Sequence, residues 1–405
     1  MIALELGVVE PLGRLTARPW ADEVTGMQID SRRIEEGDLF VAVGGGVDFV
    51  AHALARGAAA ALVPDDEHGA LAAIAGAVRS RSNARVVGIT GATGKTTTKD
   101  ILAALCSPHL RTVASEGNFN NELGVPLTLC RLEPDTELCI VEMGMRGLGQ
   151  IAWLASIARP DIGLITNIAP VHLELVETVE NVAKAKAELI EALPPGGVAV
   201  VPVEPLLEPY LRRTDIEIRR YDAEGQVGPF GAHLVAAHQV KNAAAALAVC
   251  EVLGVPVPEG GTFDVQLSPL REEVIELDEG VTLINDCYNA NPAAMAAALE
   301  HLVALAGDRR KVAVLGGMAE LGPESLSYHR AVGSELAAAG VSHLVAVGPL
   351  AAGYLDTAEG VTTVGVETAA DAVGALAEIL EPGDVVLVKG SRAVGPEAVA
   401  AKLRG

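Results

Sequence analysis

The chain has 405 residues, and its 30 Lys and Arg against 53 Asp and Glu give a formal net charge of −23. This acidic balance argues against an extended nucleic-acid-binding surface, because such a surface needs clustered Lys and Arg to neutralise phosphates. Half of the residues are hydrophobic, so the chain can bury large cores and is not disordered. At roughly 100–200 residues per domain, this length predicts two to four domains.

The sequence carries no sign of secretion or membrane insertion. Its five cysteines are odd in number and widely spaced, which favours a reducing compartment over a disulfide framework. The first ten residues lack a basic region, so no signal peptide is expected. Residues 336–355 are uncharged, but Gly and Pro interrupt them, which predicts a helix end, a strand and a helix rather than a membrane span. We expect a soluble, cytoplasmic protein.

Residues 1–83 hold short mixed segments and form the first predicted domain. The pattern predicts a strand over 38–43, an Ala-rich helix over 51–60 and a strand over 61–63. The polar run 79–83 is typical of a linker.

The second predicted domain covers residues 84–262 and begins with a short apolar strand over 85–90. Helical stretches separate three further predicted strands, near 138–142, 162–166 and 198–201. Pro- and Gly-rich sequence over 255–261 marks the end of this domain.

The third predicted domain, 263–405, alternates strands with helices. The strands are expected over 281–285, 312–315, 343–347 and 384–388. The helices are expected over 293–305 and 326–339, shortly after 347, and over 396–403. This pattern is typical of a parallel, doubly wound sheet. Such sheets bind ligands beyond the carboxyl ends of their strands.

The strongest motif is T-G-A-T-G-K-T-T-T at residues 90–98, between the strand 85–90 and a predicted helix. Backbone N–H groups of such a loop approach phosphate oxygens, its Lys reaches the terminal phosphates, and its Thr holds Mg²⁺. The strict pattern is not met because position 89 is Ile, so a Gly-rich turn is the alternative. We predict a nucleotide site made of Gly91, Ala92, Thr93, Gly94, Lys95, Thr96 and Thr97.

Two polar residues at predicted strand ends are further candidates. Glu142 ends the strand 138–142, where a carboxylate can bind Mg²⁺ directly or through water. The alternative is a solvated strand terminus. His172 follows the strand 162–166, but a lone His is usually structural and needs support from its neighbours.

Lys186 lies inside the apolar stripe of a predicted helix over 179–193. With Val182 placed at zero on a helical wheel, Lys186 falls at about 40° and Lys184 at about 200°, on the opposite face. An inward-pointing Lys is costly unless it is paired, shifted in pKa or modified. The alternative is a side chain that reaches solvent from the edge of the stripe.

Several polar residues of the later chain also stand out. Asp286 and Tyr288 follow a predicted strand, and capping does not require them, whereas Asn291 and Pro292 suit a helix start. His238 and Asn242 are four residues apart and share a helix face. Arg271 says nothing by itself.

Together these segments resemble the Mur ligase family over nearly the whole chain. The matching segments are 30–33, 37–42, 90–97, 117–126, 142–144, 166–168 with His172, 183–188, 238–242, 286–292, 320–322 and 389–392. The strings Y-N-A-N-P and K-G-S-R resemble the members that add a D-alanyl-D-alanine dipeptide.

The resemblance implies an α/β fold with three domains. These are a small mixed N-terminal domain for the UDP end of the substrate, a central P-loop ATPase domain with a parallel sheet, and a Rossmann-like, doubly wound C-terminal domain. The implied activity is the ATP-dependent ligation of D-alanyl-D-alanine to UDP-N-acetylmuramoyl-tripeptide through an acyl phosphate, with ADP and phosphate as products. This reaction belongs to peptidoglycan synthesis and hence to cell shape and division. Beyond these small molecules, the resemblance implies no partner, and we expect a monomer.

The resemblance also implies roles for individual residues. Two Mg²⁺ ions are expected, the first at Thr96 and Glu142 and the second at His172 and a Lys186 carbamylated by CO₂. Lys95, Lys186, His172 and Arg271 would be catalytic, and the adenosine or γ-phosphate would face Asn242, Arg271, Asp286 and Tyr288. The substrate contacts would include Ser31 and Arg32 at the uridine end, and also Asn120, Asn121, Asn289, Asn291, Lys389 and Ser391.

The chain departs from the family pattern at four places. The family's E-R-F-D-G string is replaced over 43–48, and G-D-M-x-E-L-G has lost its Asp at Gly317. The G-R string before the last domain is Leu270-Arg271. Between Val198 and His238 the central domain is shorter than the family suggests. The ATPase core is thus expected to be intact and the substrate periphery reduced.

Three alternatives remain open on the sequence. A sister ligase, of the folate-polyglutamate or pseudopeptidoglycan type, would use another acceptor, and the Y-N-A-N-P string argues against it. A GTPase-like switch is disfavoured because N-K-x-D is absent from the chain. A pseudoenzyme that binds UDP-muramyl precursors would lack Lys95, Glu142, His172 or Lys186, and all four are present.

Overall fold

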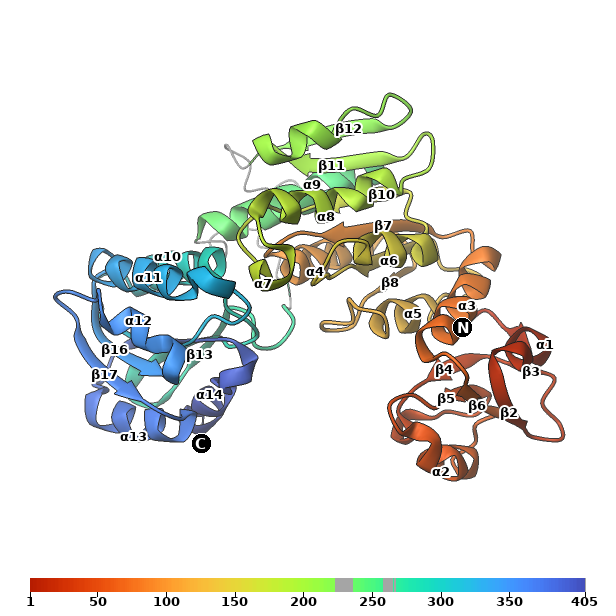
Figure 1. Cartoon of the computed structure of the whole chain (residues 1–405), viewed down its shortest axis with the longest axis horizontal. Helices are drawn as coiled ribbons and strands as arrows, with labels where there is room; N and C mark the ends of the chain where they lie inside the picture. The colour runs from red at the N-terminus through yellow and green to blue at the C-terminus, as the bar shows by residue number, and fades with distance from the viewer. Residues whose placement is uncertain (223–235, 258–264, 266, 405) are drawn as a thin grey trace.

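The computed structural model describes residues 1–222, 236–257, 265 and 267–404. Three sheet-containing parts follow one another along the chain, and the N- and C-terminal parts lie on opposite sides of the central part (Figure 1). The α/β fold class predicted from the sequence is confirmed. The boundary expected at 262/263 lies outside the described residues.

The N-terminal part holds a four-stranded sheet in the order β2-β6-β5-β4 and a two-stranded sheet of β1 and β3. The strands are β1 (Leu4–Glu5), β2 (Gly13–Ala17), β3 (Glu23–Val24), β4 (Gly26–Gln28), β5 (Asp38–Val41) and β6 (Ala60–Pro64). The helices are α1 (Leu6–Val9), α2 (Val50–Ala55) and α3 (Glu67–Arg81).

Two local predictions for this part are wrong. The helix expected over 51–60 ends at Ala55, because Gly57 takes a left-handed turn with a φ of 113° and the chain enters β6. The linker expected over 79–83 begins inside α3. Arg79 belongs to this helix, and its Nε donates a hydrogen bond to the carbonyl of Ala158, at 2.9 Å, on the central part. The side chain thus joins two parts of the molecule.

The central sheet has six parallel strands in the order β12-β11-β10-β7-β9-β8. Their bounds are β7 (Arg85–Thr90), β8 (Thr112–Ala114), β9 (Leu138–Glu142), β10 (Ile162–Ile165), β11 (Val198–Pro202) and β12 (Glu217–Tyr221). The four strands expected here are confirmed. Residues 223–235, where part of the expected shortening falls, lie outside the described residues.

Helices cover both faces of the central sheet. One face packs against α4 (Lys95–Cys106) and α9 (Ala237–Leu253). The other packs against α5 (Gly124–Leu129), α6 (Gln150–Ala158) and α8 (Val179–Glu191), and the short α7 (Leu173–Val176) precedes α8.

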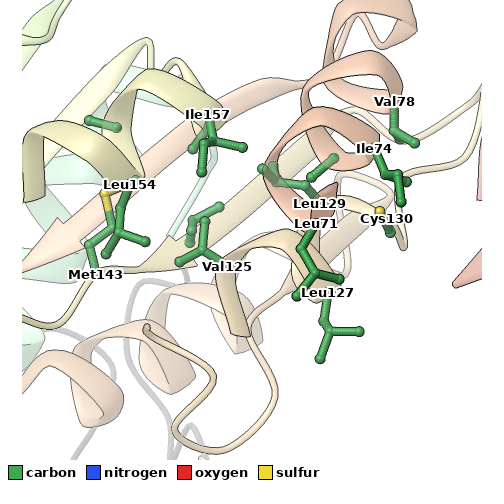
Figure 2. Close-up of a cluster of buried hydrophobic side chains, with 14 of the residues drawn as sticks. Leu71, Ile74, Val78, Val125, Leu127, Leu129, Cys130, Met143, Leu154 and Ile157 are labelled. Carbon is green, nitrogen blue, oxygen red and sulfur yellow. The ribbon is translucent and has the colours of Figure 1, made fainter. Parts of the chain in front are cut away.

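The apolar core of that second face continues into the N-terminal part. Figure 2 shows Leu71, Ile74 and Val78 of α3 lying against Leu127 and Leu129 of α5. All five side chains are at most 9% exposed. Burial of this kind contributes about 1.5–3 kcal/mol per large side chain, so α3 fixes the N-terminal part to the central one.

The C-terminal sheet has the order β13-β14-β18-β15-β16-β17, and all its pairs are parallel except the edge pair β13–β14. The strands are β13 (Glu273–Glu276), β14 (Thr282–Asp286), β15 (Lys311–Gly316), β16 (Val341–Val347), β17 (Thr362–Val366) and β18 (Val385–Lys389). The predicted doubly wound sheet is therefore confirmed, with one antiparallel edge strand added.

Helices lie on both faces of this sheet as well. Those on one face are α10 (Pro292–Ala306), α11 (Ser325–Ala338) and α12 (Ala352–Leu355), and those on the other are α13 (Ala369–Ile379) and α14 (Glu397–Leu403). Residues 336–355 form the end of α11, then β16 and α12, as predicted. Within the described ranges, every helix is too short or too polar to cross a lipid bilayer. All five cysteines are free and buried.

Candidate active site

A cavity of 840 Å³ lies where the carboxyl ends of the central strands face the C-terminal part. Its walls come from the loops after β7, β9 and β10, from the start of α9, and from the segment between β14 and α10. This is the edge at which doubly wound sheets bind ligands.

The loop between β7 and α4 requires its two glycines. A Cβ at Gly91 would lie 1.9 Å from Thr166 Oγ1, and a Cβ at Gly94 would lie 2.2 Å from Asn242 Oδ1. Asn167 Oδ1 accepts hydrogen bonds from the N–H groups of Ala92 and Thr93, at 3.0 and 2.9 Å. The loop therefore has a fixed shape, and the first turn of α4 presents N–H groups without helical partners to an anion.

Lys95 lies over this loop, where its Nζ donates to the carbonyl of Gly91 at 2.9 Å. Burial lowers the pKa of Lys95, the charge of Glu142 raises it, and the charge of Arg271 lowers it further. Both charged neighbours line the same cavity as Lys95. The ammonium is thus placed to meet the terminal phosphates of a nucleotide.

Glu142, at the end of β9, is fully buried and accepts hydrogen bonds from two neutral side chains. Thr96 Oγ1 donates to its Oε2 at 2.8 Å, and Asn120 Nδ2 donates to its Oε1 at 2.7 Å. Hydroxyl and carboxylate oxygens are the donors that Mg²⁺ prefers. Thr96 and Glu142 are thus in contact, as expected for two ligands of one ion. Asn120, which was expected to contact the substrate, instead contacts Glu142.

Lys186 on α8 is 1% exposed, whereas Lys184 is exposed, so the predicted inward orientation is confirmed. Burial holds the pKa of Lys186 well below its usual value, and the charge of Lys95 lowers it further, against the opposing charges of Glu188 and Glu142. Within the described part of the chain, Lys186 Nζ has no hydrogen bond or salt bridge. Burial of an unpartnered amine disfavours its charged form relative to its neutral form.

His172 precedes α7 with a φ of 54°, and its Nδ1 contacts Oε2 of Glu320 on the C-terminal part. Burial lowers the pKa of His172, and the hydrogen bond to Glu320 opposes this shift. Arg146 Nε lies 3.6 Å from the second oxygen of Glu320. Among the described residues, no three His, Cys, Asp or Glu side chains form a metal-binding group.

The C-terminal part contributes a cation and an aromatic ring. The Arg271 guanidinium lies 3.9 Å from the centre of the Tyr288 ring, and both line the cavity. Lys389 Nζ pairs with Asp286 Oδ2 and donates to the carbonyl of Asn289 at 3.0 Å. The buried Lys389 therefore orders the chain after β14, and Asp286 remains part of the cavity wall.

Three predicted substrate residues accept hydrogen bonds from backbone N–H groups. Asn291 Oδ1 accepts from Ala294 N and caps α10, as the sequence suggested. Asn121 Oδ1 accepts from Gly124 N at 3.0 Å. Ser391 Oγ accepts from Ala319 N at 2.9 Å.

A second cavity of 350 Å³ adjoins the first. Both cavities share Lys95, His172 and Asn289. The remaining wall of the second cavity includes small apolar side chains and both kinds of charge, at Ala290, Ala319, Glu320, Ser391 and Arg392.

Ser31 and Arg32 line neither cavity. Ser31 is buried, with its Oγ 3.0 Å from His52 Nδ1. Arg32 is exposed and pairs with Asp30 at 2.8 Å. The structure does not bring these two residues to the P-loop.

Sequence reasoning missed three residues of the site. Asn167 stands directly after β10, beside the P-loop strand, and that position at a strand end is a signal that could have singled it out. Glu320 lies in the matching segment 320–322 but was given no role there, and Arg146 carries no sequence signal. The place of both residues at the site depends on contacts between distant parts of the chain.

Two family models match the chain, the Mur ligase middle domain over residues 89–230 and the Mur ligase, glutamate ligase domain over residues 270–392. A UDP-N-acetylmuramoyl-tripeptide–D-alanyl-D-alanine ligase of Bacillus subtilis (strain 168) is 32% identical over 421 aligned positions, covering 93% of this chain and 92% of the relative.

Solved structures give the same match. MurF from Acinetobacter baumannii has a TM-score of 0.83 and 28% identity, with 98% of this chain and 97% of that one covered. MurF ligase from Thermotoga maritima, in complex with ADP, has a TM-score of 0.79 and 28% identity, covering 94% of this chain and 97% of that one.

Proposed function

Because this chain belongs to the Mur ligase family, we propose that it joins D-alanyl-D-alanine to UDP-N-acetylmuramoyl-tripeptide and converts ATP to ADP and phosphate in the same reaction. The observation that carries the proposal is one cavity in which the P-loop Lys95, the Thr96–Glu142 pair and the unpartnered Lys186 face Arg271 of the C-terminal part. The Bacillus subtilis relative bears the name of this activity.

The chemistry begins with a carboxylate, which is a poor electrophile. Transfer of the γ-phosphoryl group of ATP to the tripeptide carboxylate forms an acyl phosphate and supplies a leaving group. Lys95 and the loop N–H groups would stabilise the charge that develops on the transferring group. The dipeptide amine then attacks the carbonyl carbon and loses a proton, and phosphate leaves. Asn242, Asp286, Arg271 and Tyr288 would hold the adenosine and γ-phosphate.

The residues present fit one Mg²⁺ ion directly. Thr96 Oγ1 and the Glu142 carboxylate supply two oxygen ligands at the mouth of the P-loop. When bound there, the ion would neutralise phosphate charge.

The second predicted site fits an ion only if Lys186 is modified. His172 and an unmodified Lys186 would offer two nitrogens, which Mg²⁺ disfavours. Burial lowers the pKa of Lys186 and so favours the neutral amine, which is the form that reacts with CO₂: its lone pair attacks the carbon and a proton is released. The resulting carbamate would supply oxygen ligands to the ion, and the ion would become the partner that the Lys186 side chain lacks.

The second cavity suits a zwitterionic dipeptide. Glu320 lies beside His172 near the shared wall, and Arg392 supplies the opposite charge. Ala290 and Ala319 leave room for methyl groups. In this proposal the dipeptide amine lies toward the P-loop and its carboxylate toward Arg392, with Asn289, Asn291, Ser391 and Lys389 shaping the wall.

The rest of the substrate would extend toward the N-terminal part. Ser31 and Arg32 would contact the uridine end, and Asn120 and Asn121 the segment nearer the P-loop. The division into domains 1–83, 84–262 and 263–405 is part of this proposal, since each range holds its own sheet. We also propose that the protein acts as a monomer, and that it works in the cytoplasm, where the ATP that it would use is available.

The test is phosphate release from ATP with UDP-N-acetylmuramoyl-tripeptide, with and without D-alanyl-D-alanine. Turnover that requires both substrates supports the proposal. Turnover with free L-amino acids in place of the dipeptide contradicts it and favours a sister ligase.

A further inference from the structure

Glu272 is a carboxylate at the junction of the central and C-terminal parts, and no step proposed above uses it. It follows Arg271 directly and precedes β13, and its side chain is only 11% exposed. A buried carboxylate is costly unless hydrogen-bond donors surround it.

The partners of Glu272 come from two different helices. Its Oε1 lies 3.0 Å from His238 Nε2, and its Oε2 accepts from Gln239 Nε2 at 2.6 Å, both in the first turn of α9. On α10, His301 Nδ1 lies 4.0 Å from Oε2 and is otherwise unpartnered among the described residues. Burial would raise the pKa of Glu272, but the hydrogen bonds from His238 and Gln239 hold it at about 2. The group is therefore an anion that ties the two parts together.

The backbone on both sides of Arg271 is constrained. Leu270 and Glu272 have φ angles of 64° and 51°, in the left-handed region that side chains disfavour. Two hydrogen bonds hold this shape, from Tyr288 N to Leu270 O at 3.2 Å and from Glu272 N to Asp286 Oδ1 at 3.4 Å. The segment therefore directs the Arg271 guanidinium onto the Tyr288 ring, inside the cavity.

The next turn of α9 packs against the P-loop. Asn242, one turn after His238, lies so close to Gly94 that a Cβ there would be 2.2 Å from its Oδ1. Two successive turns of α9 thus contact Glu272 through His238 and Gln239 and the P-loop through Asn242.

We propose that Glu272 is a positioning residue, which fixes Arg271 relative to the P-loop by binding the first turn of α9. The inference rests on the proposed function, because Arg271 is taken to contact the transferring phosphoryl group. The sequence motifs do not identify Glu272. In this role, His238 and Gln239 hold Glu272 in place and so support Arg271.

The test compares Glu272→Gln with a matched control, Glu273→Gln. Glu273 is the next residue, and its carboxylate accepts from Asn285 Nδ2 at 2.9 Å and pairs with Arg404, but it does not line the cavity. Because misplacing a catalytic group by about 1 Å costs on the order of 10²-fold in rate, Glu272→Gln should lower kcat for phosphate release by roughly 10- to 100-fold. The KM for the UDP-peptide should stay within about twofold, and the control should match the wild type in both constants. Glu272→Ala should lower kcat by at least as large a factor as Glu272→Gln.

A double-mutant cycle separates positioning from general support of the fold. If Glu272 acts through Arg271, the effect of Glu272→Gln should shrink to less than about threefold in an Arg271→Lys background. If Glu272→Gln lowers kcat by the same factor in the Arg271→Lys background as in the wild type, the inference is overturned. A purely structural loss of activity would not depend on the Arg271 side chain.

Nucleotide binding keeps the inference testable apart from the ligase reaction. Calorimetry with Mg²⁺-ATP and Mg²⁺-ADP needs no peptide substrate and gives the ratio of the Kd for ADP to the Kd for ATP. Glu272→Gln should lower this ratio roughly tenfold. Glu273→Gln should leave it unchanged. An unchanged ratio in Glu272→Gln overturns the inference. A wild type that binds ATP but releases no phosphate with both peptide substrates instead contradicts the proposed function.

Discussion

Replacing Lys186 by methionine should raise stability and lower activity at the same time. Lys186→Met keeps the length of the side chain but removes an amine that is 1% exposed and has no hydrogen-bond partner among the described residues. Burying a polar group without a hydrogen-bond partner costs about 1–3 kcal/mol in proteins, and an apolar side chain of similar volume removes this cost. Each kcal/mol shifts Tm by about 2–4 °C in a domain of 150–250 residues, so Tm should rise by roughly 2 °C or more.

The difference in Tm between Lys186→Met and the wild type should depend on pH. The pKa of Lys186 is lowered on folding, so the unfolded chain binds more protons than the folded one, and wild-type stability gains with rising pH until the unfolded pKa of about 10.4. The Tm advantage of Lys186→Met should therefore narrow between neutral and alkaline pH.

The assay pairs thermal unfolding with phosphate release, and Lys184→Met is the control. Lys184 lies on the same helix but is exposed, so its replacement should change neither quantity. Lys186→Ala should also be inactive, but short carboxylic acids should partly restore it by standing in for a carbamate. Wild-type activity in Lys186→Met, or a Tm well below that of the wild type, would refute the reasoning.

Three further predictions concern neighbouring residues. Gly94→Ala should cost about 1–3 kcal/mol and weaken ATP binding in calorimetry, because its φ is 75° and a Cβ would meet Asn242; unchanged binding would contradict this. Glu142→Gln should raise the Mg²⁺ concentration for half-maximal turnover by at least about tenfold, and an unchanged Mg²⁺ titration would remove Glu142 from the metal site. Burial lowers the pKa of His172, so wild-type stability should fall below about pH 6.5, where the unfolded chain takes up the proton. The Tm of His172→Gln should fall less over the same pH range, and equal falls would count against a partly buried His172 with a lowered pKa.

Local patterns predicted the features that depend on one element. The orientation of Lys186 follows from helical periodicity alone, and the cap at Asn291 follows from its place before Pro292. The P-loop was recognisable because strand, glycines, Lys and helix follow one another within a few residues. The alternation of apolar strands with helices was enough to predict the C-terminal sheet.

Contacts between distant residues could not be predicted in this way. His172 meets Glu320 across 148 positions, and Lys389 meets Asp286 across 103. The edge strands β13 and β17 were missed because they are half exposed and carry too few apolar residues to stand out. Arg79 looked like part of a linker because its partner, the carbonyl of Ala158, lies in another part of the molecule.

Isotope transfer tests the central claim, ligation through an acyl phosphate, most directly. The tripeptide carboxylate is labelled with ¹⁸O, and the phosphate released in the presence of ATP and D-alanyl-D-alanine is examined by mass spectrometry. Because the amine attacks carbon and breaks the carbon–oxygen bond, each released phosphate should carry one carboxylate oxygen, and the dipeptide should be joined to the nucleotide-linked peptide. Product with unlabelled phosphate would contradict the acyl-phosphate route, and labelled phosphate without a new amide bond would contradict the ligase assignment.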